Sequence, residues 1–314
     1  MKLLVTGGTG FIGSALCRSF AQHGHEVVVL TRQVPPAPFQ PAIRYLSWDT
    51  PEWRRVLADR DGIINLAGES IAARRWTPRQ KQLIRESRLH TTRALIEAMA
   101  QGPHRLAVFV SASAVGYYGS REDGSCVESD PPGRGFLAQV CAAWEAEAQR
   151  AEAFGIRVIR FRIGLVLGPG GGALAKMVLP FRLGVGGPLG SGRQWMSWIH
   201  RDDVVGLIEW VLASSRIQGA VNATAPQPVT MDGFCHEIAR ALHRPCWMRV
   251  PSVGLRLLLG EMAKMLTTGQ RVIPEAALQS GYVFTYPTLA SALEAALLVS
   301  SEKYMTGIAN VGKR

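Results

Sequence analysis

The 314-residue chain has little cysteine and no long hydrophobic run, and each absence excludes a class of protein. Its five cysteines are odd in number and form no Cys-x-x-Cys pair. This usage disfavours a disulfide scaffold or a zinc ribbon and favours a reduced, cytoplasmic protein. No apolar run reaches the roughly 18–20 residues that span a bilayer, so we expect no membrane segment. Residues 1–7 lead straight into a strand-and-turn pattern, so we also expect no signal peptide.

Acidic residues are scarce relative to basic ones. Asp and Glu number 24 against 35 Lys and Arg, which gives a net charge of +11. Such a charge fits nucleic acid, an anionic membrane or an anionic small ligand. The basic residues are scattered, and no Lys/Arg block or nucleic-acid-binding motif is present. We therefore expect a small-molecule ligand and neither nucleic acid nor a membrane as partner, and the sequence leaves a homodimer open.

The histidines do not form a metal-binding pattern. None lies in a His-Glu-x-x-His motif or in a ligand-spaced cluster, so we expect no metal site.

The first half of the chain alternates short apolar runs with helical patterns. Continuous apolar strands separated by helices predict a parallel sheet covered on both faces. The fold class that fits best is α/β, a doubly wound parallel sheet of the Rossmann type. The expected strands and helices, in chain order, are Lys2–Thr6, Phe11–Gln22, Glu26–Thr31, Ile43–Trp48, Gly62–Leu66, Pro78–Gln101, Leu106–Val110, Phe136–Phe154 and Arg157–Phe161.

The pattern changes after about residue 165, where a glycine-rich stretch begins. We expect a dinucleotide-binding domain of residues 1–165 plus 198–225. A smaller mixed α/β lobe on the substrate side comprises residues 166–197 plus 226–298, followed by a solvated tail of residues 299–314. Two apolar segments of the small lobe, Pro251–Met265 and Leu289–Val299, are too short to span a bilayer and are expected to be core helices.

The strongest motif is the glycine-rich loop Gly7–Gly13, which follows a strand and opens a helix. Its glycines permit a tight turn, a close approach to a diphosphate and close packing of the helix on the strand. Amides at the start of the helix would then face the phosphate charge. The alternative is a purely structural turn. The cofactor-binding residues expected here are Gly7, Thr9, Gly10, Phe11, Ile12 and Gly13.

The end of the second strand favours NADP(H) over NAD(H). An NAD site usually has an acidic residue about 20 residues after the loop, which binds the ribose 2′-hydroxyl. This chain has Arg32 there, and no Asp or Glu occurs between Val27 and Trp48. A guanidinium can bind a 2′-phosphate through charge-assisted hydrogen bonds. The alternative is a solvated surface arginine.

Together these strings resemble the short-chain dehydrogenase/reductase superfamily in its extended, sugar-nucleotide-epimerase-like form. More narrowly, the chain resembles an atypical subgroup described as epimerase family proteins, which have a C-terminal domain of unknown function. The resemblance covers about residues 1–298. Besides the glycine loop, it rests on Asn65–Glu69, Arg74–Trp76, Ser111–Gly119, Phe181–Gly184, Trp198–His200, Asp202–Asp203 and Gly269–Pro274.

The resemblance implies that Leu66, Ala67 and Gly68 line the cofactor and that Ser111 to Ser113 face the nicotinamide. The usual chemistry of the superfamily needs a tyrosine and a lysine four residues later. Here the corresponding positions hold Leu137 and Cys141, and no Tyr-x-x-x-Lys occurs anywhere in the chain. The resemblance therefore predicts an oxidoreductase or isomerase fold without its standard acid/base pair.

Four residues are candidates for the missing chemistry: Ser113, Tyr117, Tyr118 and His200. A tyrosine beside the nicotinamide could act as acid or base if a cation such as Lys81, Arg75 or Arg88 lowered its pKa. The alternative is that both tyrosines only pack against cofactor and substrate. His200 could transfer a proton near neutral pH, or it could hydrogen-bond to hold the start of the next helix.

The substrate side offers cations and flat aromatic faces. In related extended enzymes the stretch around His200 returns to the sheet and borders the substrate cleft. Such groups suit an anionic planar ligand, whereas the alternative is a surface loop with buried tryptophans. The candidates are Glu69, Trp76, Lys81, Arg193 and Trp198. We expect an NADP-binding epimerase or oxidoreductase-like protein acting on a small substrate, with a nucleotide-linked one as a candidate. The alternative is a catalytically silent NADP(H)-binding regulatory protein.

Overall fold

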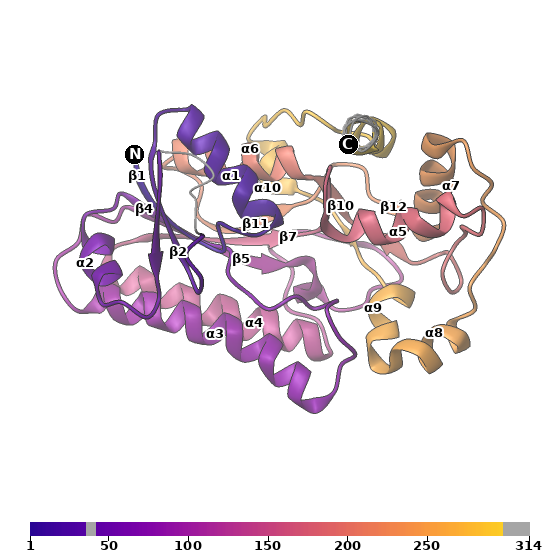
Figure 1. The fold of residues 1–314 in the computed structure, drawn as a ribbon, viewed down its shortest axis with the longest axis horizontal. Helices are drawn as coiled ribbons and strands as arrows, with labels where there is room; N and C mark the ends of the chain where they lie inside the picture. The colour runs from indigo at the N-terminus through magenta and orange to yellow at the C-terminus, as the bar shows by residue number, and fades with distance from the viewer. Residues whose placement is uncertain (36–41, 298–314) are drawn as a thin grey trace, which may run out of the picture. The chain divides into compact units, whose positions relative to one another are not determined.

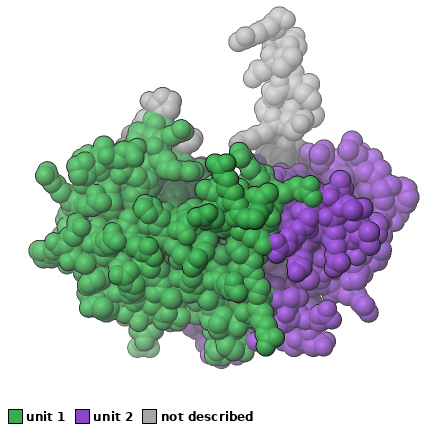
Figure 2. All heavy atoms as spheres, turned by 90° about the horizontal axis from the view of Figure 1, so that it is seen from below, with its two compact units in different colours: residues 1–119, 128–163, 205–222 green, residues 120–127, 164–204, 223–314 purple. Residues whose placement is uncertain are grey.

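The computed structural model describes residues 1–35 and 42–297, and it divides into two compact units (Figure 2). Unit 1 comprises Met1–Gly119, Glu128–Ile163 and Val205–Asn222. Unit 2 comprises Ser120–Val127, Gly164–Val204 and the described residues from Ala223 onward. The expected tail of residues 299–314 lies outside the described residues.

Unit 1 is built on a seven-stranded sheet with the order β11-β7-β5-β4-β1-β2-β3. All pairings from β3 to β7 are parallel. The order reverses between β1 and β4, the kind of position where doubly wound sheets bind ligands at the carboxyl ends of their strands. The strands are β1 (Lys2–Thr6), β2 (Glu26–Thr31), β3 (Ile43–Ser47), β4 (Gly62–Asn65), β5 (Val108–Ala114), β7 (Arg157–Ile163) and β11 (Gly219–Ala223).

Helices cover both faces of this sheet, as Figure 1 shows. One face carries α3 (Pro78–Ala100) and α4 (Phe136–Gln149), and the other carries α1 (Phe11–Gln22) and α6 (Arg201–Ala213). The first face also packs α2 (Glu52–Ala58) and the short helix η2 (Arg150–Phe154) into one apolar core. The strands read as apolar runs because both of their faces are buried, so the doubly wound prediction is confirmed.

Unit 2 contains three two-stranded sheets and several short helices. The sheets pair β8 (Leu165–Leu167) with β10 (Trp198–His200), β9 (Trp195–Met196) with β12 (Val229–Thr230), and β6 (Ser125–Cys126) with β13 (Arg271–Val272). The core contains α5 (Gly172–Arg182), α7 (Met231–Leu242) and helical residues 289–297. The remaining helices are η3 (Gly260–Ala263), α9 (Lys264–Thr267) and α10 (Glu275–Gln279), together with α8 (Ser252–Leu259).

Two predictions about the chain's course need correction. Residues 198–200 do not return to the large sheet, because β10 pairs with β8 in a sheet of its own. Residues 120–127 also lie in unit 2, since β6 pairs with β13. The boundaries of the two units therefore differ from the domain boundaries that the sequence predicted.

The apolar segment 251–265 was predicted to be a core helix and is not one. It breaks at Gly260, which has φ +61°, into α8, η3 and α9. Only Leu255 of α8 is buried, whereas Val253, Leu257 and Leu258 are exposed. Helical residues 289–297, in contrast, bury Leu289 and Leu293 in the core of unit 2, as expected. Among the described residues no helix is long and apolar enough to cross a membrane.

Candidate functional site

The glycine loop between β1 and α1 forms an open cradle in unit 1. Gly7 has φ +69°, and a Cβ there would lie 2.8 Å from the Leu66 carbonyl carbon. A Cβ on Gly13 would lie 2.2 Å from the Gly7 oxygen, so only glycine lets α1 pack this closely. Gly10 caps α1 without a side-chain hydrogen bond, and both Thr9 and Gly10 are exposed. The start of α1 therefore faces solvent without a side-chain cap, as an anion-binding helix end requires.

Arg32 stands directly after β2, at the same edge of the sheet. Its side chain is exposed, and across residues 1–35 and 42–297 it forms no ion pair with a carboxylate. The neighbouring turn is closed by the Thr31 hydroxyl, which donates to the Gln33 carbonyl at 3.1 Å. A free cation at this position can bind a phosphate without first breaking an existing salt bridge.

A buried hydrogen-bond chain holds the ends of β1, β4 and β5 together. The Thr6 hydroxyl donates to Asn65 Oδ1 at 2.7 Å, and Asn65 Nδ2 donates to Thr92 on α3 at 2.9 Å. Asn65 Nδ2 also approaches the Ser111 hydroxyl at 3.4 Å, and Thr6 accepts from the Ala67 amide. Ser111 is thus buried in this chain of contacts. The backbone after β4, where Leu66 and Ala67 were predicted to line a cofactor, is fixed by it.

Arg88 fixes the next few residues of the same loop. Its Nη1 donates to the Glu69 carbonyl at 3.0 Å and to Ile84, and its guanidinium lies over the Trp144 ring at 5.2 Å. Burial lowers the pKa of Arg88 below its usual range. A Cβ on Gly68 would meet this guanidinium at 3.1 Å. The contacts of Arg88 are with the loop after β4, with α3 and with Trp144, so its role is to hold that loop in place.

Two substrate-side candidates, Trp76 and Lys81, gather around Phe136 at the start of α4. The Trp76 ring meets the Phe136 ring edge-on at 5.2 Å, and Lys81 Nζ lies 5.3 Å from the same ring. The Trp76 indole donates to the Ile71 carbonyl at 2.8 Å. These contacts connect the 69–78 loop to α3 and α4 within unit 1.

The centre of the site is a buried ion pair that sequence reasoning missed. Arg162 on β7 donates from Nε to Glu145 Oε1 at 2.8 Å and from Nη2 to Oε2 at 2.9 Å. Ser113, the register neighbour of Arg162 across β5 and β7, donates to Glu145 Oε1 at 2.7 Å. Burial alone would lower the pKa of Arg162, but the hydrogen bonds and charge of Glu145 outweigh it and raise that pKa. The sequence did contain a signal for this ion pair, because Glu145 and Arg162 are charged residues within an otherwise apolar helix and strand.

The two tyrosines of the short helix η1 (Val115–Tyr118) differ in what they can do. Tyr118 is buried; its hydroxyl accepts from Arg162 Nη1 at 2.8 Å and donates to Asn222 Oδ1 at 2.7 Å. Burial raises the pKa of Tyr118 to about 12, opposite to the lowered pKa that acid/base work requires. Tyr117 is half-buried, with its ring 3.6 Å from the Arg162 guanidinium carbon. Arg162 on β7 therefore supplies a cation beside both tyrosines, and sequence reasoning had not named it.

Leu137 and Cys141 on α4 occupy the positions expected for the missing tyrosine and lysine. A Cβ on Gly116 would lie 3.3 Å from Leu137 Cβ and 3.9 Å from the Cys141 sulfur. The Cys141 thiol also hydrogen-bonds to the Ser113 side chain, and burial raises its pKa to about 11. A neutral thiol and an aliphatic chain thus occupy the side of α4 that packs on η1 and the end of β5.

His200 lies in unit 2 in a different environment. Its Nδ1 accepts a hydrogen bond from the Asp202 amide at 3.2 Å, and its ring packs on Tyr286 at 4.0 Å between centroids. Its Nε2 is buried without a hydrogen-bond partner among the described residues. Burial lowers the pKa of His200 to about 4, so the ring is neutral near pH 7. These contacts favour the capping role at the start of α6 over proton transfer.

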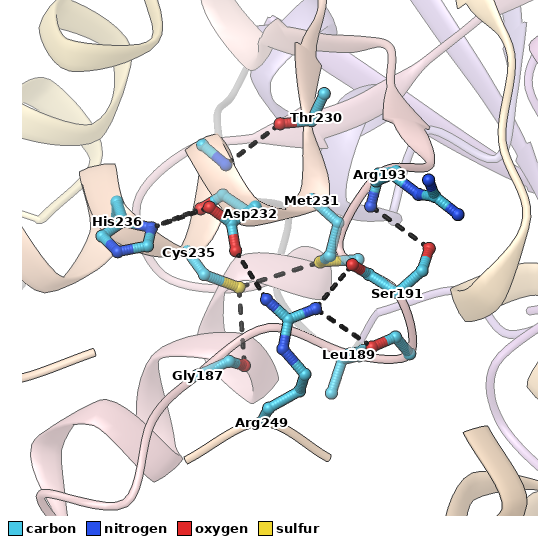
Figure 3. A network of polar contacts seen from close by, with 12 residues as sticks. Gly187, Leu189, Ser191, Arg193, Thr230, Met231, Asp232, Cys235, His236 and Arg249 are labelled. Atoms are coloured by element: carbon cyan, nitrogen blue, oxygen red, sulfur yellow. Dashed lines mark hydrogen bonds and ion pairs between the residues drawn. The ribbon is translucent and has the colours of Figure 1, made fainter. Parts of the chain in front are cut away.

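The glycine-rich loop 184–192 of unit 2 is fastened along its length. Figure 3 shows Arg249 reaching its backbone: Nη1 donates to the Ser191 carbonyl while Nη2 donates to Asp232 Oδ1 at 3.1 Å. The Gly190 amide donates to the Val250 carbonyl, and the Val250 amide donates to the Pro188 carbonyl. Hydrogen bonds therefore hold the loop in place at several points along its backbone.

Two more of the five substrate-side candidates, Arg193 and Trp198, lie in unit 2, whereas Glu69 lies in unit 1, where its carbonyl accepts from Arg88. Arg193 is exposed, and its amide donates to the Ser191 hydroxyl. Trp198 is fully buried in the unit 2 core, where its indole donates to the Gln227 carbonyl at 3.0 Å. The prediction that Trp198 faces substrate is therefore not supported by its position. Over residues 1–35 and 42–297, no group of three His, Cys, Asp or Glu side chains could hold a metal ion.

Comparison with known proteins fits this arrangement. Residues 3–223 match the model of the NAD dependent epimerase/dehydratase family, and residues 250–296 match a domain of unknown function, DUF1731. A chloroplastic homologue of epimerase family protein SDR39U1 from Arabidopsis thaliana is 41% identical, covering 94% of this chain and 86% of its own. Epimerase family protein YfhF from Bacillus subtilis is 40% identical, covering 93% and 97%.

Solved structures agree with the sequence relatives. The crystal structure of human epimerase family protein SDR39U1 (isoform 2) with NADPH is 35% identical, covers 94% of this chain and 99% of its own, and has a TM-score of 0.85. A UDP-glucuronic acid 4-epimerase from Bacillus cereus, at 19% identity and a TM-score of 0.79, shares the fold. The chain belongs to the NAD dependent epimerase/dehydratase family, with a C-terminal DUF1731 domain.

Proposed function

We propose that unit 1 binds NADP(H) and that the protein is an extended short-chain dehydrogenase/reductase with an altered active site. The observation that supports this most is the uncapped glycine cradle at α1 together with the free Arg32 after β2. A side chain at Gly7 or Gly13 would collide with backbone within 3 Å, so these glycines keep the turn tight. The exposed, uncapped start of α1 that results fits the diphosphate of a dinucleotide. A 35% identical human relative was crystallised with NADPH, which supports the choice of the 2′-phosphorylated form.

In this proposal the residues divide the work as follows. The amides from Gly7 to Gly13 bind the diphosphate, and Arg32 binds the 2′-phosphate. The backbone at Leu66–Gly68, fixed by Asn65 and Arg88, packs along the nucleotide. When bound, NADP(H) supplies or accepts a hydride.

Tyr117 is the group in unit 1 that we propose to face the substrate. It is half-buried, and the Arg162 guanidinium positions its ring from one face. The Ser113 hydroxyl donates a hydrogen bond to Glu145. Toward a substrate, the Ser113 oxygen can therefore accept a hydrogen bond but cannot donate one. We propose a small substrate with a hydroxyl or carbonyl group, and a nucleotide-linked one is the first class to test.

A second candidate function is a catalytically silent NADP(H)-binding regulator. The observation that favours it is the Leu137 and Cys141 pair on the face where an acid/base tyrosine and lysine would stand. Neither an aliphatic chain nor a thiol with a raised pKa replaces them at neutral pH.

Calorimetric titration of the purified, cofactor-stripped protein with NADPH, NADP⁺, NADH and NAD⁺ tests the cofactor proposal. We expect NADP(H) to bind more tightly than NAD(H), and Arg32→Gln to remove most of that preference because the 2′-phosphate loses its cation. Loss of one charge-assisted contact should weaken NADPH binding roughly tenfold to a hundredfold. Arg44→Gln on β3, an exposed arginine paired with Glu52, is the matched control and should leave binding unchanged. Equal affinity for all four dinucleotides would contradict the role of Arg32.

A turnover assay distinguishes the enzyme proposal from the regulator proposal. NADPH absorbance is followed with nucleotide-linked sugars and small carbonyl compounds, using wild type and Tyr117→Phe. The enzyme proposal expects consumption by wild type, reduced at least about tenfold in Tyr117→Phe, while NADPH affinity stays the same. Tight NADPH binding with no turnover on any of these substrates favours the regulator.

Three further expectations from the sequence stay predictions. A small molecule remains the expected ligand and nucleic acid the disfavoured one. The cytoplasmic location rests on five free cysteines, four of them buried. The homodimer stays open.

A further inference from the structure

The segment that begins at Trp247 exposes an unusual number of large apolar side chains. Trp247 is 64% exposed, and α8 adds Val253, Leu257 and Leu258 at 66%, 76% and 71%. Val253 and Leu257 are four residues apart, so they lie on one side of the helix, and Leu258 points about 100° further round from Leu257. We call these four residues the α8 face. Leu255, on the other side of α8, is the residue that anchors the helix to unit 2.

Exposed apolar clusters of this kind mark interaction sites more often than chance positions. A single exposed leucine needs no explanation, but four large apolar residues between positions 247 and 258 do. Covering the three aliphatic side chains would remove a large apolar area from water, which favours association. A partner that covered this face would therefore bind it favourably.

Charge selects the kind of occupant. The exposed Arg256 lies on α8, and the exposed Arg244 lies three residues before Trp247. The exposed Arg182 lies two residues before Gly184, whose carbonyl accepts a hydrogen bond from the Trp247 indole. No acidic residue occurs within four positions of any of these three arginines. None of them forms an ion pair among the described residues. Arg249 also lies in the segment, but its Nη2 is paired with Asp232.

Segment 184–190 connects Trp247 to the end of α5 through hydrogen bonds. The Trp247 indole donates to the Gly184 carbonyl at 3.0 Å, and the Trp247 amide donates to Gly186. Leu183 and Val185, which flank Gly184, are also exposed. The apolar surface of unit 2 therefore continues from the end of α5 to Trp247.

A second copy of the chain is a poor occupant. An isologous dimer through this face would place Arg256 near its own counterpart, like charge against like. Residues 298–314 of the same chain hold Lys303, Lys313 and Arg314 against one acidic residue, Glu302, so they are also repelled. Nucleic acid would satisfy the arginines but leave the exposed leucines without a partner. An anionic lipid surface satisfies both, since acyl chains accept the leucines and headgroups accept the guanidiniums.

We propose that the α8 face is a peripheral docking site for anionic lipid membranes. The aliphatic side chains and Trp247 enter the boundary between headgroups and acyl chains, and the arginines contact lipid phosphates. This interaction requires no spanning helix and does not depend on the proposed cofactor function. It differs from the sequence expectation that no membrane is a partner. That expectation rested on the absence of a spanning run and of a Lys/Arg block, and it treated segment 251–265 as core.

Vesicle co-sedimentation of the full chain tests the proposal. The probes are vesicles of phosphatidylcholine alone and vesicles of phosphatidylcholine with an equal part of phosphatidylglycerol. We expect binding to the anionic vesicles, weakened by added salt because the attraction is screened. Leu257→Ser with Leu258→Ser should weaken it at least about tenfold, and Arg256→Gln about fivefold. Both variants change exposed side chains, and unchanged circular dichroism and Tm would show that they fold.

The matched control is Leu278→Ser with Val283→Ser, which removes two exposed apolar residues of unit 2 outside the α8 face. It should bind vesicles as wild type does. Three outcomes would overturn the proposal: no binding to anionic vesicles, equal binding to neutral ones, or equal loss in the control variant. Sedimentation velocity runs alongside, and a dimer that dissociates in the Leu257→Ser, Leu258→Ser variant would assign the face to a second copy instead.

Discussion

Unit 1 and unit 2 each bury an ionisable residue close to the end of a parallel strand, with opposite results. In unit 1 the buried Arg162 keeps its charge, because Glu145, Tyr118 and the Glu128 carbonyl all accept from it. In unit 2 the buried His200 has one hydrogen bond, and the exposed Asp202 carboxylate lies 3.7 Å from its Nδ1. Burial lowers the pKa of His200 more than Asp202 raises it, so the ring stays neutral near pH 7. Burial alone therefore does not identify a reactive group. The partners decide whether the charge survives.

Removing the partner of Arg162 should give the largest effect. Glu145→Gln leaves a buried guanidinium without its counter-ion, and we expect a loss of about 3–5 kcal/mol in the free energy of unfolding. Urea denaturation followed by circular dichroism measures it.

Glu147→Gln on the same helix is the control, because Glu147 pairs with the exposed Arg93 and Arg150 and should cost less than about 1 kcal/mol. The double variant Glu145→Leu, Arg162→Met should recover much of the lost stability. Similar losses in Glu145→Gln and Glu147→Gln would remove the distinction between the buried ion pair and the pairs with exposed arginines.

The next effect concerns His200 and pH. The folded pKa of about 4 lies below the ordinary value of 6.5, so the unfolded chain takes up the proton first as pH falls. The contribution of neutral His200 is complete above about pH 6.5 and is lost as pH falls toward 4, by up to about 3 kcal/mol. Unfolding free energies measured across this range should fall less steeply in His200→Asn than in wild type. His236→Asn, which changes an exposed histidine, should keep the wild-type slope.

The smallest effect is expected at the exposed network of Figure 3. Arg249 and Asp232 are about half exposed, so Arg249→Ala should cost at most about 1 kcal/mol. Its local consequence is larger than its global one, because Arg249 holds the 184–192 backbone. Hydrogen exchange of amides in this loop should become faster, while exchange in the β1 and β4 strands stays unchanged. Unaltered exchange in the loop would show that Pro188 and Val250 fasten it without Arg249.

Much of the fold and of the cofactor cradle could be predicted from the sequence. The doubly buried strands read as apolar runs, and the glycines from Gly7 to Gly13 are required by contacts only 2–3 Å from a missing Cβ. Arg32 stands where a local pattern places it, directly after β2. These features depend on residues that are close in the chain, so a single sequence contains the information.

The rest required partners distant in sequence. Tyr117 and Tyr118 are adjacent and chemically identical, yet only Tyr118 meets Asn222, which is 104 residues away. The cation beside them comes from β7, and sequence proximity pointed instead to α3 and the loop before it. Trp198 and segment 251–265 were both misjudged, because apolar character does not reveal which residues are covered.

The sequence by itself determined the sheet, the glycine cradle and the absence of a Tyr-x-x-x-Lys pair, since each follows from local periodicity, from backbone sterics or from residue identity. The tertiary structure alone decided which buried groups keep a charge, which of the two tyrosines is buried in hydrogen bonds and which apolar helix faces solvent. Those outcomes depend on desolvation and on long-range hydrogen bonds, which exist only once β5, β7 and α4 have come together.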